Sequence, residues 1–183
     1  MNTILQKKNI ILNCQPKAKE DIIKEIGKIF YDDGYTTEKY TQAMLDKEKV
    51  FNTAIGNAVA IPHGSEEGKC EVKKSGLVIM TFPQGTDWGG ETVKLVIGIA
   101  GVGDEHIDIL SNIAITCSDE DEVDEILKSS VDDISQYLRQ YGSRIIIHLL
   151  IHILLQNNHL GGLYHENKSS QNVRYPRFTP GRI

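Results

Sequence analysis

Apolar residues recur along the first 141 residues in two patterns, one with helical spacing and one with short continuous runs. The helical spacing predicts five helices, over Lys19–Asp33, Thr37–Lys49, Glu105–Cys117, Asp119–Lys128 and Asp132–Tyr141. The continuous runs predict four strands, over Asn9–Asn13, Ala58–Ile61, Gly76–Phe82 and Val93–Ala100. Strands and helices alternate through most of this stretch, which predicts a layered α/β domain.

The segments between these elements are predicted from turn residues, charge and capping residues. A charged connection is expected over Ser65–Lys74, and a turn or hairpin tip over Pro83–Gly90. Thr36 or Thr37 is a natural N-cap for the second helix. The glycine-rich loop after Ala100 matches neither GxGxxG nor a P-loop, so the sequence does not indicate a nucleotide-binding site.

The character of the chain changes after Tyr141. Residues 1–140 hold 15 Lys and Arg against 24 Asp and Glu, a net charge of −9, whereas residues 141–183 hold five against one, a net charge of +4. Within this tail, Ile145–Leu155 is almost wholly apolar but too short to span a bilayer. We therefore expect a domain over residues 1–141 and an atypical basic and apolar tail over 142–183. A docking helix, an oligomer contact and an artefact of readthrough or an altered reading frame remain open for the tail.

Composition narrows the class of protein. The chain has 183 residues, the length of one domain, with 40% hydrophobic and 25% charged residues as in an ordinary soluble protein. No signal-peptide pattern and no membrane-spanning run is present, and Cys14, Cys70 and Cys117 are too widely spaced for a CxxC motif. We expect free thiols, a cytoplasmic protein and no membrane insertion. The acidic body argues against a nucleic-acid partner and is compatible with a small basic protein partner.

The first candidate for chemistry is His63, which follows the predicted strand Ala58–Ile61. Pro62 fixes its own φ, and Gly64 lets the backbone turn sharply and leaves room beside the imidazole. An imidazole held at the end of a strand is placed to act as a nucleophile. The alternative is an ordinary loop histidine whose ring contacts a backbone carbonyl.

A second histidine strengthens the first interpretation. His106 follows the predicted strand Val93–Ala100 through the loop Gly101–Glu105. Because the carboxyl ends of adjacent strands converge into a site in open α/β sheets, we expect His63 and His106 to face each other.

Residues 3–141 resemble the IIA domain of the mannitol-fructose class of the bacterial sugar phosphotransferase system, and most closely its mannitol branch. Five segments in this order and at these separations carry the resemblance: Tyr40–Lys49, Ile55–Asn57, Ala60–Gly64, Leu95–Ala100 and Asp104–Leu110. The expected fold is a three-layer α/β/α sandwich with a mixed, mostly parallel sheet.

The resemblance implies a phosphocarrier. His63 would accept a phosphoryl group from the carrier protein HPr and pass it to a cysteine of the IIB component, with His106 as the second active-site histidine. Lys47 stands where the family has an Arg, so the positive charge is kept but the planar fork that binds phosphate through two hydrogen bonds is lost. An unperturbed pKa of about 6.5 would leave the imidazole neutral for attack near pH 7.

Other groups would complete the site. Ser65 could offer a hydroxyl to the phosphoryl group, and backbone amides after Gly64 would help if a helix begins there, although Glu66 and Glu67 work against such an anion site. No cofactor or metal is expected. His148 and His152 have the i, i+4 spacing of metal ligands, but no acidic or thiol ligand lies near them in the sequence.

Two other functions compete with this interpretation. A regulatory IIA-like domain, of the nitrogen-regulatory or transcription-regulator type, would signal by phosphorylation-dependent binding. The Asp104–His106 spacing and the Trp88–Glu91 tip favour the mannitol branch. A metal-dependent hydrolase is disfavoured because the sequence has no carboxylate–histidine cluster with ligand spacing. We expect a free-standing phosphocarrier of the mannitol branch.

Overall fold

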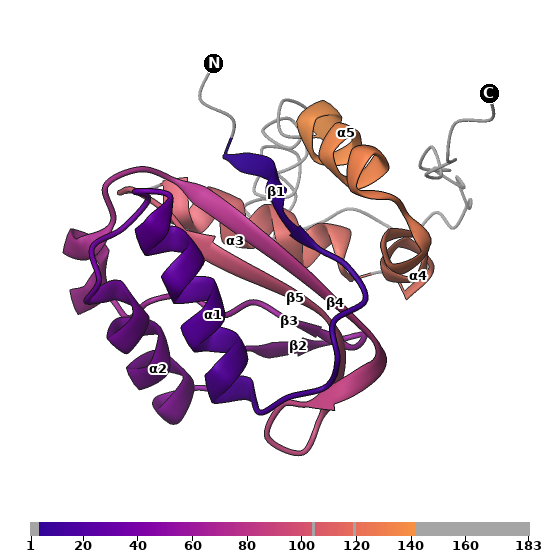
Figure 1. Ribbon diagram of the computed structural model, residues 1–183, viewed down its shortest axis with the longest axis horizontal. Helices are drawn as coiled ribbons and strands as arrows, with labels where there is room; N and C mark the ends of the chain where they lie inside the picture. The colour runs from indigo at the N-terminus through magenta and orange to yellow at the C-terminus, as the bar shows by residue number, and fades with distance from the viewer. Residues whose placement is uncertain (1–3, 104, 119, 142–183) are drawn as a thin grey trace, which may run out of the picture. The chain divides into compact units, whose positions relative to one another are not determined.

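The structure is a computed structural model that describes residues 4–103, 105–118 and 120–141 (Figure 1). The chain divides after Ser135 into two compact units, and the first unit holds the sheet and the candidate site. Among the described residues, no helix is long and apolar enough to cross a membrane.

One five-stranded sheet forms the centre of the first unit, with the strand order β1-β4-β5-β3-β2. The strands are β1 Leu5–Ile11, β2 Ala54–Gly56, β3 Val59–Ala60, β4 Gly76–Asp87 and β5 Thr92–Ala100. The pairs β1–β4 and β3–β5 are parallel, whereas β2–β3 and β4–β5 are antiparallel. The mixed sheet is confirmed, but it is evenly mixed rather than mostly parallel, because short turns join the two antiparallel pairs.

Helices cover both faces of this sheet (Figure 1), as the predicted three-layer α/β/α sandwich requires. The helices along the chain are α1 Lys19–Asp32, α2 Tyr40–Val50, α3 Glu105–Thr116, α4 Glu120–Lys128 and α5 Val131–Tyr141, with a 3₁₀ turn η1 over Glu67–Glu71. Helices α1 and α2 lie on one face, and α3 lies on the other (Figure 1). The α/β class predicted from the sequence is confirmed.

Several predicted boundaries differ from the structure, and strand β1 covers Leu5–Ile11 rather than Asn9–Asn13. Strand β4 runs on to Asp87, through the predicted turn over Pro83–Gly90, because a register shift between Thr81 and Thr86 accommodates the extra residues. Strand β2 and the turn η1 were not predicted. Helix α2 begins at Tyr40 rather than Thr37, and its N-cap is Lys39 without a side-chain cap, because the Thr37 hydroxyl donates instead to the Glu71 carboxylate.

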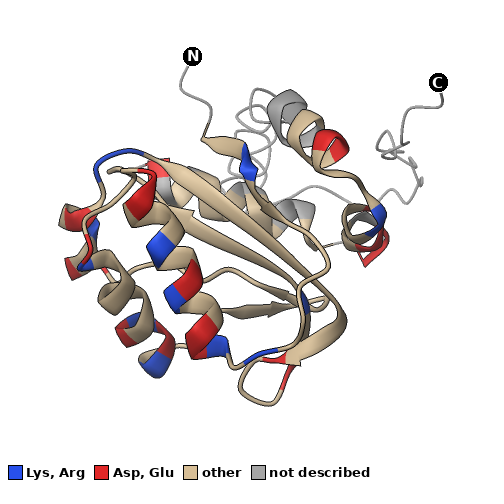
Figure 2. Ribbon diagram, in the orientation of Figure 1, with Lys and Arg blue, Asp and Glu red and all other residues tan. Residues whose placement is uncertain are grey.

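The packing of α1 fixes the position of α2. The buried face of α1 packs on the sheet through Ile22, Ile23, Ile26 and Phe30. On its flank, a Cβ at Gly27 would lie 2.2 Å from the Thr41 hydroxyl oxygen, so the two helices approach closely only because this residue is glycine. The outward faces of α1 and α2 carry interspersed acidic and basic residues (Figure 2).

A tight hairpin connects β2 to β3. Its two central residues, Asn57 and Ala58, have φ of +47° and +59°, which is the geometry of a type I′ turn. The Asn57 side chain donates to the carbonyl of Cys117 over 2.9 Å. Asn57 therefore shapes and anchors this turn.

Candidate active site

His63 lies at the carboxyl end of the sheet. Beyond the end of β3 the chain continues beside β5, where His63 forms an isolated parallel bridge with Ile99, and the Ile99 amide donates to the Pro62 carbonyl over 3.0 Å. Since β3 and β5 are adjacent and parallel, the loop after β5 leaves the same edge of the sheet and leads into α3. His106 belongs to the first turn of α3, but its side chain lies outside the described residues.

The contact of the His63 ring with its own backbone assigns the tautomer. Nδ1 lies 2.7 Å from the carbonyl oxygen of Ile61. Because a carbonyl oxygen can only accept, Nδ1 carries the proton and Nε2 carries the lone pair. The nucleophilic atom of this imidazole is therefore Nε2.

The surroundings favour the neutral form of this imidazole. Partial burial lowers the pKa of His63 below its ordinary value of 6.5, and the charge of Lys47 also lowers it. The hydrogen bond to Ile61 and the charge of Glu48 raise the same pKa without restoring it. A lowered pKa favours the neutral ring, with its lone pair on Nε2, as the pH approaches 7.

Tyr40, the first residue of α2, links the loop after His63 to β5. Its hydroxyl donates to the Ile99 carbonyl over 2.8 Å and accepts from the Gly64 amide over 3.0 Å. The side chain is 2% exposed, and burial raises the pKa of Tyr40 to about 12, so the hydroxyl stays protonated at neutral pH. The sequence did not indicate this role, because both partners of the hydroxyl are distant from Tyr40 in the chain.

The backbone after His63 is packed tightly against α2. A Cβ at Gly64 would lie 2.5 Å from the Tyr40 ring, so this position admits only glycine without displacement of the ring. The Ser65 amide donates to the Ala43 carbonyl over 3.3 Å. The Gly64 and Ser65 amides thus both have partners within the protein, and hydrogen bonds from its own backbone amide and from the Ser65 side chain lower the pKa of the exposed Glu67 carboxyl.

Lys47 supplies positive charge close to His63. It lies two turns after Tyr40 on α2, is partly buried, and holds its amino group 5.4 Å from the centre of the Phe51 ring. Its charge acts on the pKa of His63, which places a cation within electrostatic range of the imidazole. In phosphoryl transfer, a positive charge near the reacting atoms stabilises the negative phosphoryl oxygens.

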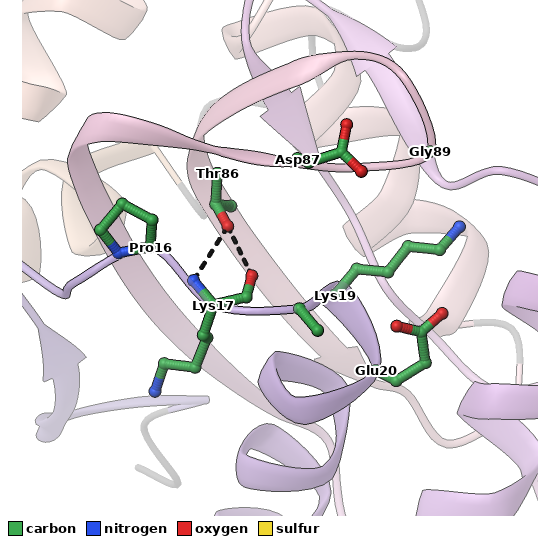
Figure 3. Close-up of a pocket in the computed structure, with 8 residues that line it drawn as sticks. Pro16, Lys17, Lys19, Glu20, Thr86, Asp87 and Gly89 are labelled. Carbon is green, nitrogen blue, oxygen red and sulfur yellow. Dashed lines mark hydrogen bonds between the residues drawn. The ribbon is translucent and has the colours of Figure 1, made fainter.

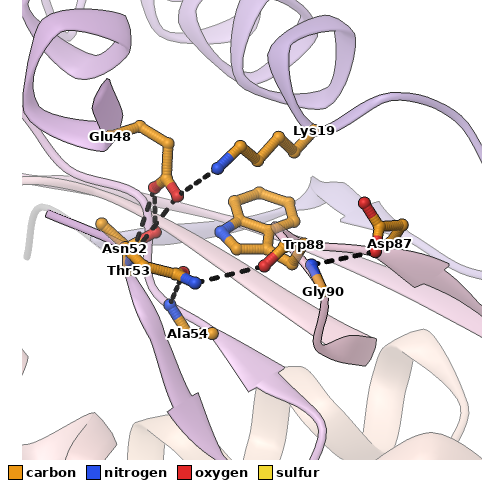
Figure 4. A network of polar contacts seen from close by, with 8 residues as sticks. All are labelled: Lys19, Glu48, Asn52, Thr53, Ala54, Asp87, Trp88 and Gly90. Carbon is orange, nitrogen blue, oxygen red and sulfur yellow. Dashed lines mark hydrogen bonds and ion pairs between the residues drawn. The ribbon is translucent and has the colours of Figure 1, made fainter. Parts of the chain in front are cut away.

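The next residue, Glu48, is a buried carboxylate that the sequence did not single out. It accepts the Thr53 hydroxyl over 2.5 Å and pairs with the Lys19 ammonium over 3.2 Å (Figure 4). The Thr53 carbonyl in turn accepts the Ile61 amide over 3.0 Å. A chain of hydrogen bonds therefore runs from Glu48 through Thr53 and Ile61 to Nδ1 of His63.

Two clefts lie outside this cluster. A cleft of about 400 Å³ separates the start of α1 from the end of β4, where the Thr86 hydroxyl exchanges two hydrogen bonds with the Lys17 backbone (Figure 3). It lies at the opposite end of β5 from His63, and its two lysines, Lys17 and Lys19, are paired with carboxylates.

A second cleft, of about 490 Å³, lies where β1 and β4 begin and β5 ends. In its wall the Ser75 hydroxyl accepts the Val102 amide over 3.1 Å and donates to the Glu105 carboxylate. These bonds fasten the loop that leads into α3. Across the part of the chain that the structure describes, no group of three His, Cys, Asp or Glu residues could hold a metal ion, and His148 and His152 lie outside that part.

Comparison with known proteins identifies the family. Residues 3–141 match the family described as "Phosphoenolpyruvate-dependent sugar phosphotransferase system, EIIA 2". The chain is 44% identical over 141 residues to the mannitol-specific phosphotransferase enzyme IIA component of Staphylococcus aureus, covering 76% of this chain and 98% of that protein. It is 45% identical over 131 residues to the component of the same name from Bacillus subtilis, covering 71% of this chain and 92% of that one.

A solved structure gives the same result. The complex of enzyme IIA-mannitol and phosphorylated enzyme IIB-mannitol from Escherichia coli matches with a TM-score of 0.67 and 35% identity, over 74% of this chain and 99% of that one. The resemblance noted from the sequence is confirmed. This chain belongs to the EIIA 2 family of the phosphoenolpyruvate-dependent sugar phosphotransferase system.

Proposed function

We propose that the protein is the phosphocarrier of a mannitol phosphotransferase system, accepting a phosphoryl group from phospho-HPr on Nε2 of His63 and passing it to a cysteine of IIB. The observation that carries this proposal is the contact between Nδ1 and Ile61, which leaves the lone pair on Nε2 at the edge of the sheet. The identity of 44–45% to mannitol-specific components supports mannitol as the sugar. The proposed place of action is the cytoplasm.

The transfer proceeds in two steps, each between His63 and one partner protein. The Nε2 lone pair attacks the phosphorus of the donor's phosphohistidine, the donor's N–P bond breaks, and its electron pair returns to the donor imidazole. Positive charge develops on the His63 ring, which strengthens the hydrogen bond from Nδ1 to the Ile61 carbonyl. In the second step a thiolate sulfur of IIB attacks the phosphorus, and the electron pair of the N–P bond returns to Nε2.

The remaining site residues assist in this proposal. Lys47 offsets the charge of the phosphoryl oxygens as they pass, and the Ser65 hydroxyl donates to one of them by turning away from Glu67. Gly64 leaves space beside the His63 ring. Its amide stays bonded to the Tyr40 hydroxyl and is not a phosphate ligand in this proposal. His106 is proposed from the family resemblance as a second donor to the phosphoryl group.

The test is phosphorylation by phospho-HPr, followed by mapping of acid-labile phosphate. We expect one phosphoryl group on His63, none on the His63→Ala variant, and transfer from His63 to IIB of a mannitol permease in preference to IIB of a fructose permease. His106→Ala should still accept phosphate but transfer it roughly a hundredfold more slowly. Undiminished labelling of His63→Ala would overturn the proposal.

We also propose residues 1–141 as the functional unit, since the family match ends at residue 141. A chain ending at Tyr141 should accept phosphate at the rate of the full chain. A folded 1–141 protein that takes up no phosphate would place the boundary elsewhere. Light scattering on both forms reports separately whether residues 142–183 affect association.

A further inference from the structure

We propose that Tyr40 is a positioning residue for phosphoryl transfer, because its hydroxyl ties the backbone after His63 to the end of β5 and so sets the direction of Nε2. The inference rests on the proposed function of His63. It assigns a role to a buried group that takes no part in the chemistry itself.

The Tyr40 hydroxyl bonds to two backbone groups, the Gly64 amide and the Ile99 carbonyl, that a regular sheet would pair with each other. In a regular parallel ladder, the residue after a bridged position donates its amide hydrogen to the carbonyl of the bridge partner. His63 is bridged to Ile99, and the first ladder bond, from the Ile99 amide to Pro62, is present at 3.0 Å. At the second position the Tyr40 hydroxyl stands between the two groups, accepting from Gly64 over 3.0 Å and donating to Ile99 over 2.8 Å.

The hydroxyl therefore helps to hold the backbone that follows His63. The backbone before His63 is held to β5 directly, while the backbone after it is held one hydroxyl group further away. The Tyr40 ring also lies directly against Gly64, where a Cβ would approach it to 2.5 Å. His63 therefore sits at the point where the ladder opens, with its backbone fixed on both sides.

A hydroxyl is suited to this place because it accepts through a lone pair and donates its proton at the same time. The ring of Phe would fill the same space but leave a buried amide and a buried carbonyl without their partner. The backbone would then close toward the regular ladder or open to water, and either movement would turn His63. A displacement of about 1 Å in a reacting group can slow a reaction on the order of a hundredfold.

Tyr35 provides a matched control. It is also 2% exposed. Both rings pack edge-to-face against Phe30, with ring centres 6.0 Å away for Tyr35 and 6.2 Å away for Tyr40. The Tyr35 hydroxyl accepts over 2.7 Å from the side-chain amide of Gln6 in β1, a strand that β4 and β5 separate from β3. Tyr35→Phe and Tyr40→Phe thus remove the same atom from the same apolar cluster.

The experiment compares the full-length wild type with both variants. Nitrogen-15 NMR of the His63 ring reports the tautomer without any phosphoryl transfer, and rapid-quench labelling by phospho-HPr gives the maximal rate and the half-saturating donor concentration. In Tyr40→Phe we expect a mixture of tautomers and a maximal rate lowered roughly ten- to a hundredfold, with the half-saturating concentration unchanged because Tyr40 is buried. Tyr35→Phe should retain the wild-type tautomer and rate.

Wild-type tautomer and rate in Tyr40→Phe, or equal losses in both variants, would overturn the inference. If Tyr40→Phe does not fold, 3-fluorotyrosine at position 40 changes the donor and acceptor strength of the hydroxyl while keeping it. It should alter the maximal rate at least about threefold relative to the same replacement at position 35, and equal rates would again overturn the inference. A wild type without phosphate on His63 would refute the proposed function, while the tautomer comparison would still test Tyr40.

Discussion

Replacement of the buried Glu48 by Gln should weaken both the fold and the setting of His63. The Glu48 side chain is 3% exposed, and its partner Lys19 is 21% exposed. The glutamine would keep the shape of the side chain but remove its charge, so the Thr53 hydroxyl would donate to a neutral oxygen and the Lys19 ammonium would lose its counter-charge. The substitution also places an amide N–H where both partners present donors.

The magnitude follows from these contacts. A hydrogen bond to a charged group contributes about 1.5–3 kcal/mol and a neutral one about 0.5–1.5 kcal/mol, so the change at Thr53 costs about 1 kcal/mol, and the Lys19 ammonium left without its counter-charge costs about 1–2 kcal/mol more. The donor facing Lys19 adds to this loss, while the partial exposure of Lys19 limits it. We expect Glu48→Gln to lower the free energy of unfolding by about 2–4 kcal/mol.

The same substitution makes a signed prediction for the imidazole. The charge of Glu48 raises the pKa of His63, so its removal should lower that pKa further. Asp46→Asn is the matched control, because Asp46 lies on the same helix and pairs with Lys49 over 3.0 Å at an exposed position. This control should leave both the stability and the pKa of His63 unchanged within error.

Urea denaturation measures the free energy of unfolding, and an NMR titration of the His63 ring measures its pKa. Glu48→Gln as stable as Asp46→Asn would refute the network as a stabilising element. A pKa of His63 that rises in Glu48→Gln would refute the electrostatic part of the reasoning.

Three further predictions concern single residues. Because the folded state lowers the pKa of His63, the unfolded chain binds a proton first as the pH falls through 6.5. The stability difference between wild type and His63→Gln should therefore be constant well above pH 6.5 and move against wild type as the pH falls through and below it. Lys47→Arg restores a planar fork and should speed uptake from phospho-HPr several-fold, whereas Lys47→Gln should slow it and raise the pKa of His63. Ala58→Gly relieves a φ of +59° and should raise the free energy of unfolding by about 0.5–1 kcal/mol, whereas Ala54→Gly in β2 should lower it.

The sequence predicted those features that depend on neighbouring residues. The helix boundaries of α1 and α3 follow apolar spacing and agree within a residue or so. The placement of His63 at a strand end follows from Pro62 and Gly64, and the structure confirms it. The two interpretations of His63 are compatible, because the carbonyl contact expected of an ordinary loop histidine falls on Nδ1 and leaves the lone pair on Nε2, the atom of the proposed attack.

Features that depend on distant residues could not be predicted in this way. Glu48 lies on a helix among charged neighbours, so its sequence context suggests an exposed side chain, and only the approach of Lys19 and Thr53 explains its burial. The partners of Tyr40 lie 24 and 59 residues away. One general signal was available, since a buried tyrosine hydroxyl nearly always requires a partner.

The contacts of α2 explain why one helix carries so much of the site. Tyr40 at its start holds the backbone after His63, and Glu48 near its end holds Thr53, whose carbonyl fixes the residue that binds Nδ1. Lys47 lies between these two anchors, on a helix that Gly27 allows to pack closely on α1. Rigid supports of this kind let a charge act without reorganisation during transfer. A lysine in place of the family's arginine can therefore supply charge at a fixed place, and what it loses is the second hydrogen bond of the fork.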